Sequence, residues 1–260
     1  MNLDLSDDFK ILQVAGKDAS SFLQNQLTND VRQSSFKILQ WQAICSRAGL
    51  VQSIFGLWGT EENYYLLLPV ATLENTLNIL NKYAVFSKVK LNLLSDVKIL
   101  FHFKNETESE SKTAWLIESF NSNQLFLAWP NAPFIFNDAP ALLQIRAAFI
   151  IEKFPWLTAE TIDCFRPHEI NLIDLNIINF KKGCFPGQEI IARMHYRGKV
   201  KQKLYAIQTQ KVVNYSPGTV LFVGGKKIGQ VVDSIFLNNT HYLSVVLEDN
   251  HLDFFENSSC

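Results

Sequence analysis

The sequence has only four cysteines, and no two of them are close in the chain. They are Cys45, Cys164, Cys184 and Cys260. Such wide spacing specifies neither a disulfide framework nor a four-ligand zinc or iron–sulfur site. Any cysteine chemistry is therefore expected from a single thiol.

Long apolar runs are also missing. No stretch approaches the roughly 20 apolar residues that a membrane-spanning helix needs. The first residues, which include Asp4, Asp7 and Asp8, lack the basic start and apolar run of a signal peptide. We therefore expect a cytoplasmic protein without a membrane partner.

Neither sign of charge dominates. The chain has 24 Lys and Arg against 25 Asp and Glu, a net charge of −1, and 47% of its residues are hydrophobic. This composition excludes a highly charged disordered chain and argues against attraction of the whole molecule to nucleic acid, so a polyanion would need a local patch. The absence of internal repeats and low-complexity tracts sets aside solenoid architectures.

The sequence does contain a succession of strand and helix patterns. Alternating apolar residues predict strands, and apolar residues at helical spacing predict helices over 19–27, 73–83 and 141–153. Asp18 is positioned as the N-cap of the first helix, and Pro140 precedes the last. The expected strands or strand-rich runs cover residues 9–14, 41–45, 50–58, 64–68, 88–103, 114–129, 204–209, 220–223, 228–232 and 242–247.

These patterns predict an α+β fold in three parts. Residues 1–103 are expected to form an α+β domain, and residues 104–200 a second α+β portion that carries Cys184. The polar segment 104–112 is expected as an exposed connection. Residues 201–260 are rich in short strands and turn residues, which favours a small antiparallel β-barrel or sandwich.

The segment Lys182 to Glu189, which reads Lys-Gly-Cys-Phe-Pro-Gly-Gln-Glu, is the candidate functional centre. Pro186 suits the first turn of a helix over 187–194, which would place Cys184 just ahead of the helix N-terminus. The helix dipole and the two preceding lysines would favour a thiolate, which could be a nucleophile, a metal ligand or a redox group. The alternative is a small buried side chain at a tight turn, because free cysteine is commonly buried.

The neighbours of Cys184 suggest a turn followed by a cap. Gly183 and Gly187 permit a sharp turn and a close approach of the backbone. Gln188 and Glu189 would either cap the helix or contact a polar ligand. Both interpretations stay open from the residue types.

Residues 181–203 form the most basic part of the chain, with Glu189 as their only acidic residue. This basic segment would bind the glutamate tail of a folate or a phosphate backbone, or would simply be solvated surface. Tyr196 adds a ring on which a base could stack. The basic residues are Lys181, Lys182, Arg193, Arg197, Lys199, Lys201 and Lys203.

Other candidate sites are weaker. His102, His168, His241 and His251 do not have the mutual spacing of metal ligands, and no bound metal is expected. No Gly-x-Ser-x-Gly elbow occurs, which gives a serine hydrolase little support.

Several segments together resemble the YgfZ family. The segment from Phe180 to Glu189, followed by Ala192-Arg193 and Tyr196-Arg197-Gly198, is similar to the family signature. Most of the chain is covered by the resemblance. The further matching residues are 16–19, 23–24, 26–31, 82–89, 167 and 171.

The resemblance implies a function. YgfZ proteins are folate-binding proteins related to the aminomethyltransferase (T-protein) of the glycine cleavage system, and they are linked to tRNA modification and to the maintenance of iron–sulfur enzymes. The implied layout is two ferredoxin-like α+β portions and a C-terminal β-barrel around a central channel that accepts tetrahydrofolate or another folate. The implied site residues are Cys184 with Lys182, Gly183, Gly187, Gln188 and Glu189 in support, and Phe9, Arg193, Tyr196 and Arg197 as folate contacts.

The chain departs from the T-protein pattern at three places. Where the T-protein hairpin carries a catalytic aspartate, this chain has Gln52 and Ser53, which argues against aminomethyltransferase activity. A helix carboxylate resembling the T-protein's pterin-holding group is replaced by Arg146. Of two tryptophans implicated in folate contact, the first is matched by Phe9, which keeps an aromatic ring, and the second falls near Pro140.

The leading hypothesis is a folate-binding accessory protein that supports iron–sulfur enzymes, including tRNA-modifying enzymes, through Cys184. Two alternatives stay open. One is a folate-dependent one-carbon transferase or a thiol redox catalyst. The other is a tRNA-binding module that uses the basic segment.

Overall fold

The computed structural model describes residues 3–104, 115–121, 124–130, 140–210, 214–248 and 251. Most of the predicted connection over 104–112 lies outside these residues, as does Cys260. Within the described ranges, no helix is long and apolar enough to cross a bilayer.

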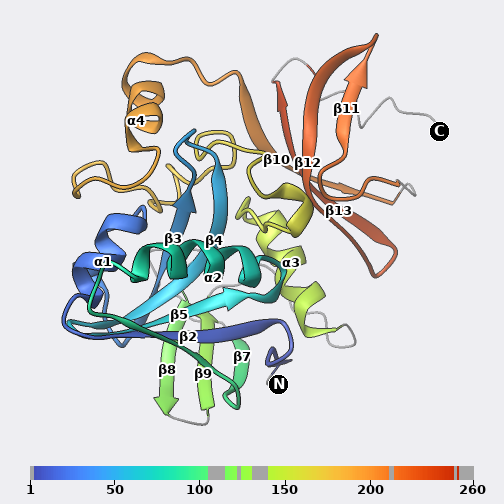
Figure 1. Ribbon diagram of the computed structural model, residues 1–260. Coiled ribbons are helices and arrows are strands. Elements are labelled where there is room, and N and C mark those ends of the chain that lie inside the picture. Colours follow the sequence, from blue (N-terminus) through green and yellow to red (C-terminus); the bar gives the residue numbers. More distant parts are fainter. Residues whose placement is uncertain are drawn as a thin grey trace.

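Nine strands form one large sheet in the order β1-β7-β9-β8-β3-β4-β5-β2-β6 (Figure 1). The pair β7 and β9 is parallel, and all other neighbours are antiparallel. The strands are β1 (Leu3–Asp4), β2 (Phe9–Ala15), β3 (Ile38–Cys45), β4 (Val51–Thr60), β5 (Asn63–Pro69), β6 (Lys90–Leu94), β7 (Lys98–Lys104), β8 (Trp115–Asn121) and β9 (Gln124–Pro130).

Two helices cover one face of this sheet, as the period-two pattern of β2 dictates. Leu12 and Val14 belong to the same buried cluster as the apolar residues of α1 (Ala19–Gln26) and α2 (Val70–Ala84). The alternate residues of β2 join the other core cluster instead. Successive side chains of a strand point to opposite faces, so one alternating run supplies both layers.

The opposite face is covered by α3 (Ala141–Ile151) and by an irregular stretch that contains a short 3-10 helix, η2 (Ala159–Thr161). The core here is rich in aromatic rings. Trp41 packs on Phe154 with ring centroids 4.6 Å apart, and Trp115 stacks on Phe149 at 5.7 Å. Close aromatic packing of this kind contributes stability beyond the area that it buries.

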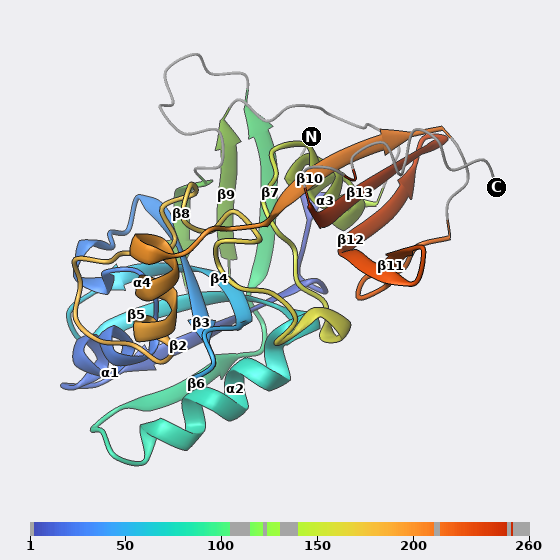
Figure 2. The ribbon, with the colours of Figure 1, turned by 90° about the horizontal axis from the view of Figure 1, so that it is seen from above.

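The C-terminal strands form a second, four-stranded antiparallel sheet in the order β10-β13-β12-β11. Figure 1 and Figure 2 show α3 between this sheet and the large one, and α3 contacts β10, β12 and β13. The strands are β10 (Gln202–Thr209), β11 (Val220–Val223), β12 (Lys226–Leu237) and β13 (Thr240–Glu248).

The structure confirms the mixed α+β class and refines its layout. Strands β1, β3, β7, β8 and β9 link the two expected α+β portions in one continuous sheet. The ferredoxin-like character of each portion, the closure of the C-terminal sheet into a barrel, and the domain boundaries near residues 103 and 200 stay predictions.

One detail of the α1 prediction is wrong. Asp18 lies at the N-cap position, but its side chain does not cap the helix. It accepts a hydrogen bond from the backbone N–H of Lys88 at 2.7 Å. At Gly16, with φ of 136°, a Cβ would lie 2.2 Å from the Lys88 oxygen. The carboxylate of Asp18 therefore holds the distant segment around Lys88 and does not cap α1.

Candidate functional site

The turn that carries Cys184 displays this cysteine between two buried side chains. Lys182 is only 5% exposed and Phe185 is also buried, whereas Gly183 and Cys184 are exposed. The ammonium nitrogen of Lys182 lies 5.3 Å from the centre of the Phe185 ring. The two anchors fix the turn, and the thiol between them faces solvent. Cys184 is therefore not a small buried side chain of the core.

Lys182 closes the C-terminal end of α1. Its Nζ donates hydrogen bonds to the backbone oxygen of Gln24, at 2.5 Å, and to that of Leu27. The last carbonyls of a helix have no partner within the helix and attract cations. The turn is thus attached to a helix more than 150 positions away in the chain.

Burial lowers the pKa of Lys182 to about 8, and nearby Arg32 acts in the same direction. Asp30 and Cys184 oppose this shift. The expectation that Lys182 forms part of an exposed basic patch is wrong, because its charge is directed into α1.

The turn after Cys184 rests on the hairpin between β3 and β4. Gly187 has φ of 78°, and a Cβ at this position would lie 2.4 Å from the Ser46 oxygen and 2.8 Å from the Gly49 Cα. Gly49 also has a positive φ, of 74°. A left-handed residue in backbone contact with its neighbour requires glycine. Gly183 has no neighbour within 4 Å of a Cβ, so the close approach expected there occurs at Gly187 alone.

The helix after the turn, α4 (Gln188–Arg197), begins later and ends later than predicted. Pro186 precedes its N-cap Gly187 and is not in its first turn. The N–H of Gln188 donates to the Phe185 oxygen at 3.2 Å. Among the described residues, no α4 amide donates to the Cys184 sulfur, and neither Gln188 nor Glu189 caps the helix. The expected cradle of amides around the thiol is therefore absent from this part of the structure.

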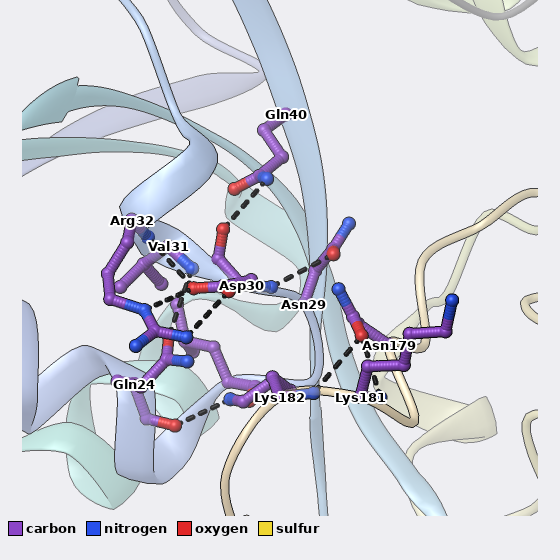
Figure 3. Close-up of polar contacts among 10 residues, drawn as sticks. Gln24, Asn29, Asp30, Val31, Arg32, Gln40, Asn179, Lys181 and Lys182 are labelled. Carbon is purple, nitrogen blue, oxygen red and sulfur yellow. Dashed lines mark hydrogen bonds and ion pairs between the residues drawn. The ribbon is translucent and has the colours of Figure 1, made fainter.

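A polar network joins the end of α1 to the segment before Cys184 (Figure 3). Asn29 donates to the Asn176 oxygen at 3.0 Å, and the Asn179 N–H donates to the Thr28 oxygen at 3.0 Å. Asp30 is held by two 2.8 Å hydrogen bonds from the Arg32 guanidinium, which keep the pKa of Asp30 below its usual value.

The rest of the basic segment lies at the surface. Arg193, Tyr196 and Arg197 are all exposed on α4, which buries only Ile191. Lys181, Lys199, Lys201 and Lys203 are also exposed. These residues of the predicted patch are therefore accessible at the surface.

A cavity of about 400 Å³ lies between the loops after α3, His195 of α4 and strand β10. Lys153, His168, His195, Lys203 and Tyr205 contribute to its lining. Both ring nitrogens of His168 are buried without a hydrogen-bond partner in the described protein. Burial and the neighbouring His195 lower the pKa of His168, which favours the neutral imidazole.

The hairpin that carries a catalytic aspartate in T-proteins has an amide here. Gln52 donates to Asp163 at 2.8 Å, which brings a surface carboxylate to the hairpin from a distant loop. Ser53 is buried and bonds to Thr76 at 2.7 Å. Nearby Cys45 is buried, which raises the pKa of its thiol. The residues that replace the aspartate are thus occupied by structural contacts.

Arg146 is occupied in a buried ion pair. Its guanidinium binds both oxygens of Asp233 on β12, with one contact at 3.0 Å. The cation that replaces the family carboxylate therefore joins α3 to the C-terminal sheet and does not face the His168 cavity.

Phe9 does not offer a face to a ligand. It is fully buried and packs edge-on against Trp115 and Trp156, with centroids 6.3 Å and 5.6 Å apart. No face of the Phe9 ring is accessible to a folate.

Sequence reasoning missed Asn179. Its amide oxygen accepts hydrogen bonds from the backbone N–H groups of Lys181 and Lys182, at 2.9 Å and 3.2 Å. An asparagine that bonds to the backbone two residues later is a common turn former, and this spacing before the lysine pair was a usable signal.

Comparison with known proteins identifies relatives along most of the chain. No family model matches. The tRNA-modifying protein YgfZ of Colwellia psychrerythraea is 28% identical over 233 residues, which cover 80% of this chain and 71% of that protein. The tRNA-modifying protein YgfZ of Aliivibrio fischeri is 27% identical and covers 95% of this chain and 85% of its own length. The chain resembles the YgfZ proteins.

The fold also agrees with this resemblance. The glycine cleavage system aminomethyltransferase T from Bartonella henselae superimposes with a TM-score of 0.63 over 95% of this chain and 78% of that chain. The two sequences are 14% identical, so the likeness concerns the fold alone. The YgfZ-like chain therefore has a T-protein-like fold, as the signature around Cys184 predicted.

Proposed function

We propose that this protein is a YgfZ-type accessory factor for tRNA modification and that it acts through the exposed thiol of Cys184. The observation that carries the proposal is the display of Cys184 between buried Lys182 and Phe185, within a chain that resembles proteins named for tRNA modification. Two buried anchors around one exposed thiol hold the sulfur at a fixed place for a partner.

The partner in this proposal is an iron–sulfur enzyme that modifies tRNA. An exposed cysteine can bind iron, or it can attack a disulfide of a partner, forming a mixed disulfide while the other sulfur leaves as a thiolate; both reactions use the Cys184 thiolate. Among the described residues, no group of three or more His, Cys, Asp and Glu side chains could hold a metal ion. Cys184 would therefore supply one ligand or one exchanging thiol to a centre that the partner carries.

A Cys184→Ala variant is expected to support at least fivefold less tRNA thiomethylation than the wild type. The test uses a strain that lacks its YgfZ-type protein, and the modified nucleosides are measured by mass spectrometry. The matched control is Cys164→Ala, because Cys164 is half-buried and its thiol donates to backbone oxygens. Full thiomethylation with the Cys184 variant, at equal protein levels, would exclude the role of this thiol.

The proposal includes tetrahydrofolate or another folate as ligand, in the His168 cavity. Small-molecule sites commonly have volumes of about 300–1,000 Å³ and a few placed polar groups. His168 contributes to the wall of this cavity, and Lys153 and Lys203 supply cations for carboxylates alongside one acidic residue, Asp174. These residues fit a heterocycle with an acidic tail, and their part is to bind and orient it.

Tetrahydrofolate titration of the purified protein is expected to show binding that His168→Leu weakens about tenfold, because the change replaces a polar side chain in the cavity wall by an apolar one of different shape. His102→Leu is the matched control, because His102 lies on β7 and does not line the cavity. Equal affinities of the wild type and both variants would show that folate does not bind in this cavity. The titration follows tryptophan fluorescence at neutral pH, where His168 is uncharged.

A further inference from the structure

A second hollow, here called the amide groove, lies beside the signature turn. Its volume is about 560 Å³, and His195 lines both this groove and the His168 cavity. Amide side chains and aromatic rings dominate its lining, and within the described chain no carboxylate contributes. The residues that matter most are Gln33, Asn176, Asn179, Phe180, Lys181 and Tyr196.

The amide of Asn179 is fixed in one orientation. Its oxygen accepts from the N–H groups of Lys181 and Lys182, and its nitrogen lies on the side away from these bonds (Figure 3). That nitrogen has no hydrogen-bond partner in the part of the chain that the structure describes. A donor held in this way matches a carbonyl or ring nitrogen at the edge of a nucleobase.

The wall next to Asn179 is rigid as well. Asn29 donates to the Asn176 oxygen at 3.0 Å, and Gln40 donates to the Asp30 oxygen at 3.0 Å. Because these amides are already bonded to the protein, the groove is preformed. A ligand would pay little to order it.

Aromatic rings form another wall. Phe180 stacks on His195 with centroids 4.2 Å apart and 18° between the planes. Tyr196 meets both rings at steeper angles, 60° and 77°, yet remains 70% exposed. An exposed ring beside fixed amides offers a face on which a base can stack.

The charges around the groove suit a chain of phosphates. Lys181 lines the groove, and α4 carries exposed Arg193 and Arg197. The nearby carboxylate of Asp30 is already neutralised by Arg32. The two arginines lie one turn apart on α4, whose one acidic residue is Glu189, so the positive charge is spread over more than one position, whereas a folate carries its negative charge only at one tail. A polyanion uses such a surface more fully.

We propose that the amide groove binds an unpaired nucleobase of an RNA strand, while the basic residues of α4 contact the neighbouring phosphates. This inference rests on the proposed role in tRNA modification and names the part of the RNA that is recognised. A base within a duplex has its pairing edge covered, so the groove selects a loop or a single-stranded end.

Fluorescence anisotropy with two labelled RNAs tests the inference. A single-stranded 12-mer is expected to bind at least tenfold more tightly than a blunt duplex of the same length. Tyr196→Leu is expected to weaken binding of the single strand about tenfold and to leave the duplex unchanged, because only unpaired bases stack on the ring. Phe86→Leu is the matched control, since Phe86 is 85% exposed and does not line the groove.

A phosphate contact gives a different signature. Arg197→Ala is expected to weaken the binding of both RNAs. It should also reduce, by about one unit, the slope of the logarithm of the binding constant against the logarithm of the salt concentration. Equal affinity for the single strand and the duplex, or equal effects of Tyr196→Leu and Phe86→Leu, would overturn the inference. Displacement of the single strand by tetrahydrofolate, in wild type and in His168→Leu alike, would instead make the groove a folate site.

These outcomes are separable from those of the proposed function. If groove variants bind RNA normally while Cys184→Ala still lowers thiomethylation at least fivefold, only the groove assignment fails. If Tyr196→Leu weakens RNA binding while a strain with the Cys184→Ala variant thiomethylates its tRNA fully, the groove assignment stands and the proposed role of the thiol is excluded.

Discussion

Replacing Arg146 by Met is expected to lower the free energy of unfolding by about 3–5 kcal/mol, because the change leaves a buried carboxylate without its partner. Asp233 is completely buried and Arg146 is 16% exposed. The pair joins α3 to β12, so its loss weakens the contact between the helix and the C-terminal sheet. Urea unfolding, followed by tryptophan fluorescence, measures the difference.

The loss of unfolding free energy caused by Arg146→Met should become smaller as the pH falls from about 7.5 to about 5. Burial raises the pKa of Asp233, and Arg146 opposes this shift. Without Arg146 the pKa rises further, and the folded state then binds this proton more tightly than the unfolded chain. In the variant, the contribution of Asp233 to the free energy of unfolding therefore falls as the pH rises above the pKa of this aspartate in the unfolded chain, and it recovers toward acidic pH.

Arg166→Met is the matched control for this experiment. Arg166 pairs with Glu169 at 3.6 Å, but its side chain is 43% exposed, and such surface pairs contribute at most about 1 kcal/mol. Equal losses in the two variants would contradict a buried, structural role for Arg146. The double variant Arg146→Met/Asp233→Leu should regain most of the lost stability, because neither charge is then left buried alone.

Lys182→Met is expected to lower the free energy of unfolding by about 2–3 kcal/mol, because two carbonyls at the end of α1 lose their hydrogen-bond donor. Gln24 and Leu27 supply these carbonyls. Lys181→Met is the matched control, since Lys181 is the exposed neighbour of the same turn. Urea midpoints near pH 7 provide the comparison, and equal losses would mean that the α1 contact contributes nothing.

The pH dependence of Lys182 has a definite sign. Its pKa in the folded protein is lowered to about 8, below the ordinary value of 10.5. Between these values the unfolded chain binds more protons than the folded one, so stability rises with pH across this window. The advantage of the wild type over Lys182→Met should therefore grow from pH 7 to about pH 9.5. A constant difference would show that Lys182 titrates normally.

Local patterns predicted most helices and strands because each pattern records which face of an element is buried. Apolar alternation in β2 indicated its span, and helical spacing indicated α2. The order of the strands was not accessible in this way. Strand β3 pairs with β8, about 75 positions later, through a short register around Leu39 and Trp115. Such pairing depends on the whole core and leaves no local signal.

The sequence predicted a turn followed by a helix around Cys184, but not the contacts of this turn. Lysine is rarely buried, so nothing in the residue type indicated that Lys182 closes α1 while Lys181 stays at the surface. The residue type of Cys184 left open whether its side chain is buried or exposed. Its exposure is seen only in the structure, where Lys182 and Phe185 on either side of it are buried. Phe9 was placed in a strand correctly, yet its surroundings come from Trp115 and Trp156, which are far away in sequence.

The contact between Gly187 and Gly49 has a consequence for anyone who would graft the cysteine turn onto another scaffold. Gly49 occupies the space that a side chain on Gly187 would need, a side chain on Gly49 would meet Ile190 and Ile191 of α4, and both glycines have left-handed backbones. The turn is thus one half of a two-part unit, and its other half is the hairpin between β3 and β4. A transplanted peptide that carries only residues 182–189 would lack the surface that shapes it, so a faithful graft has to move both segments together.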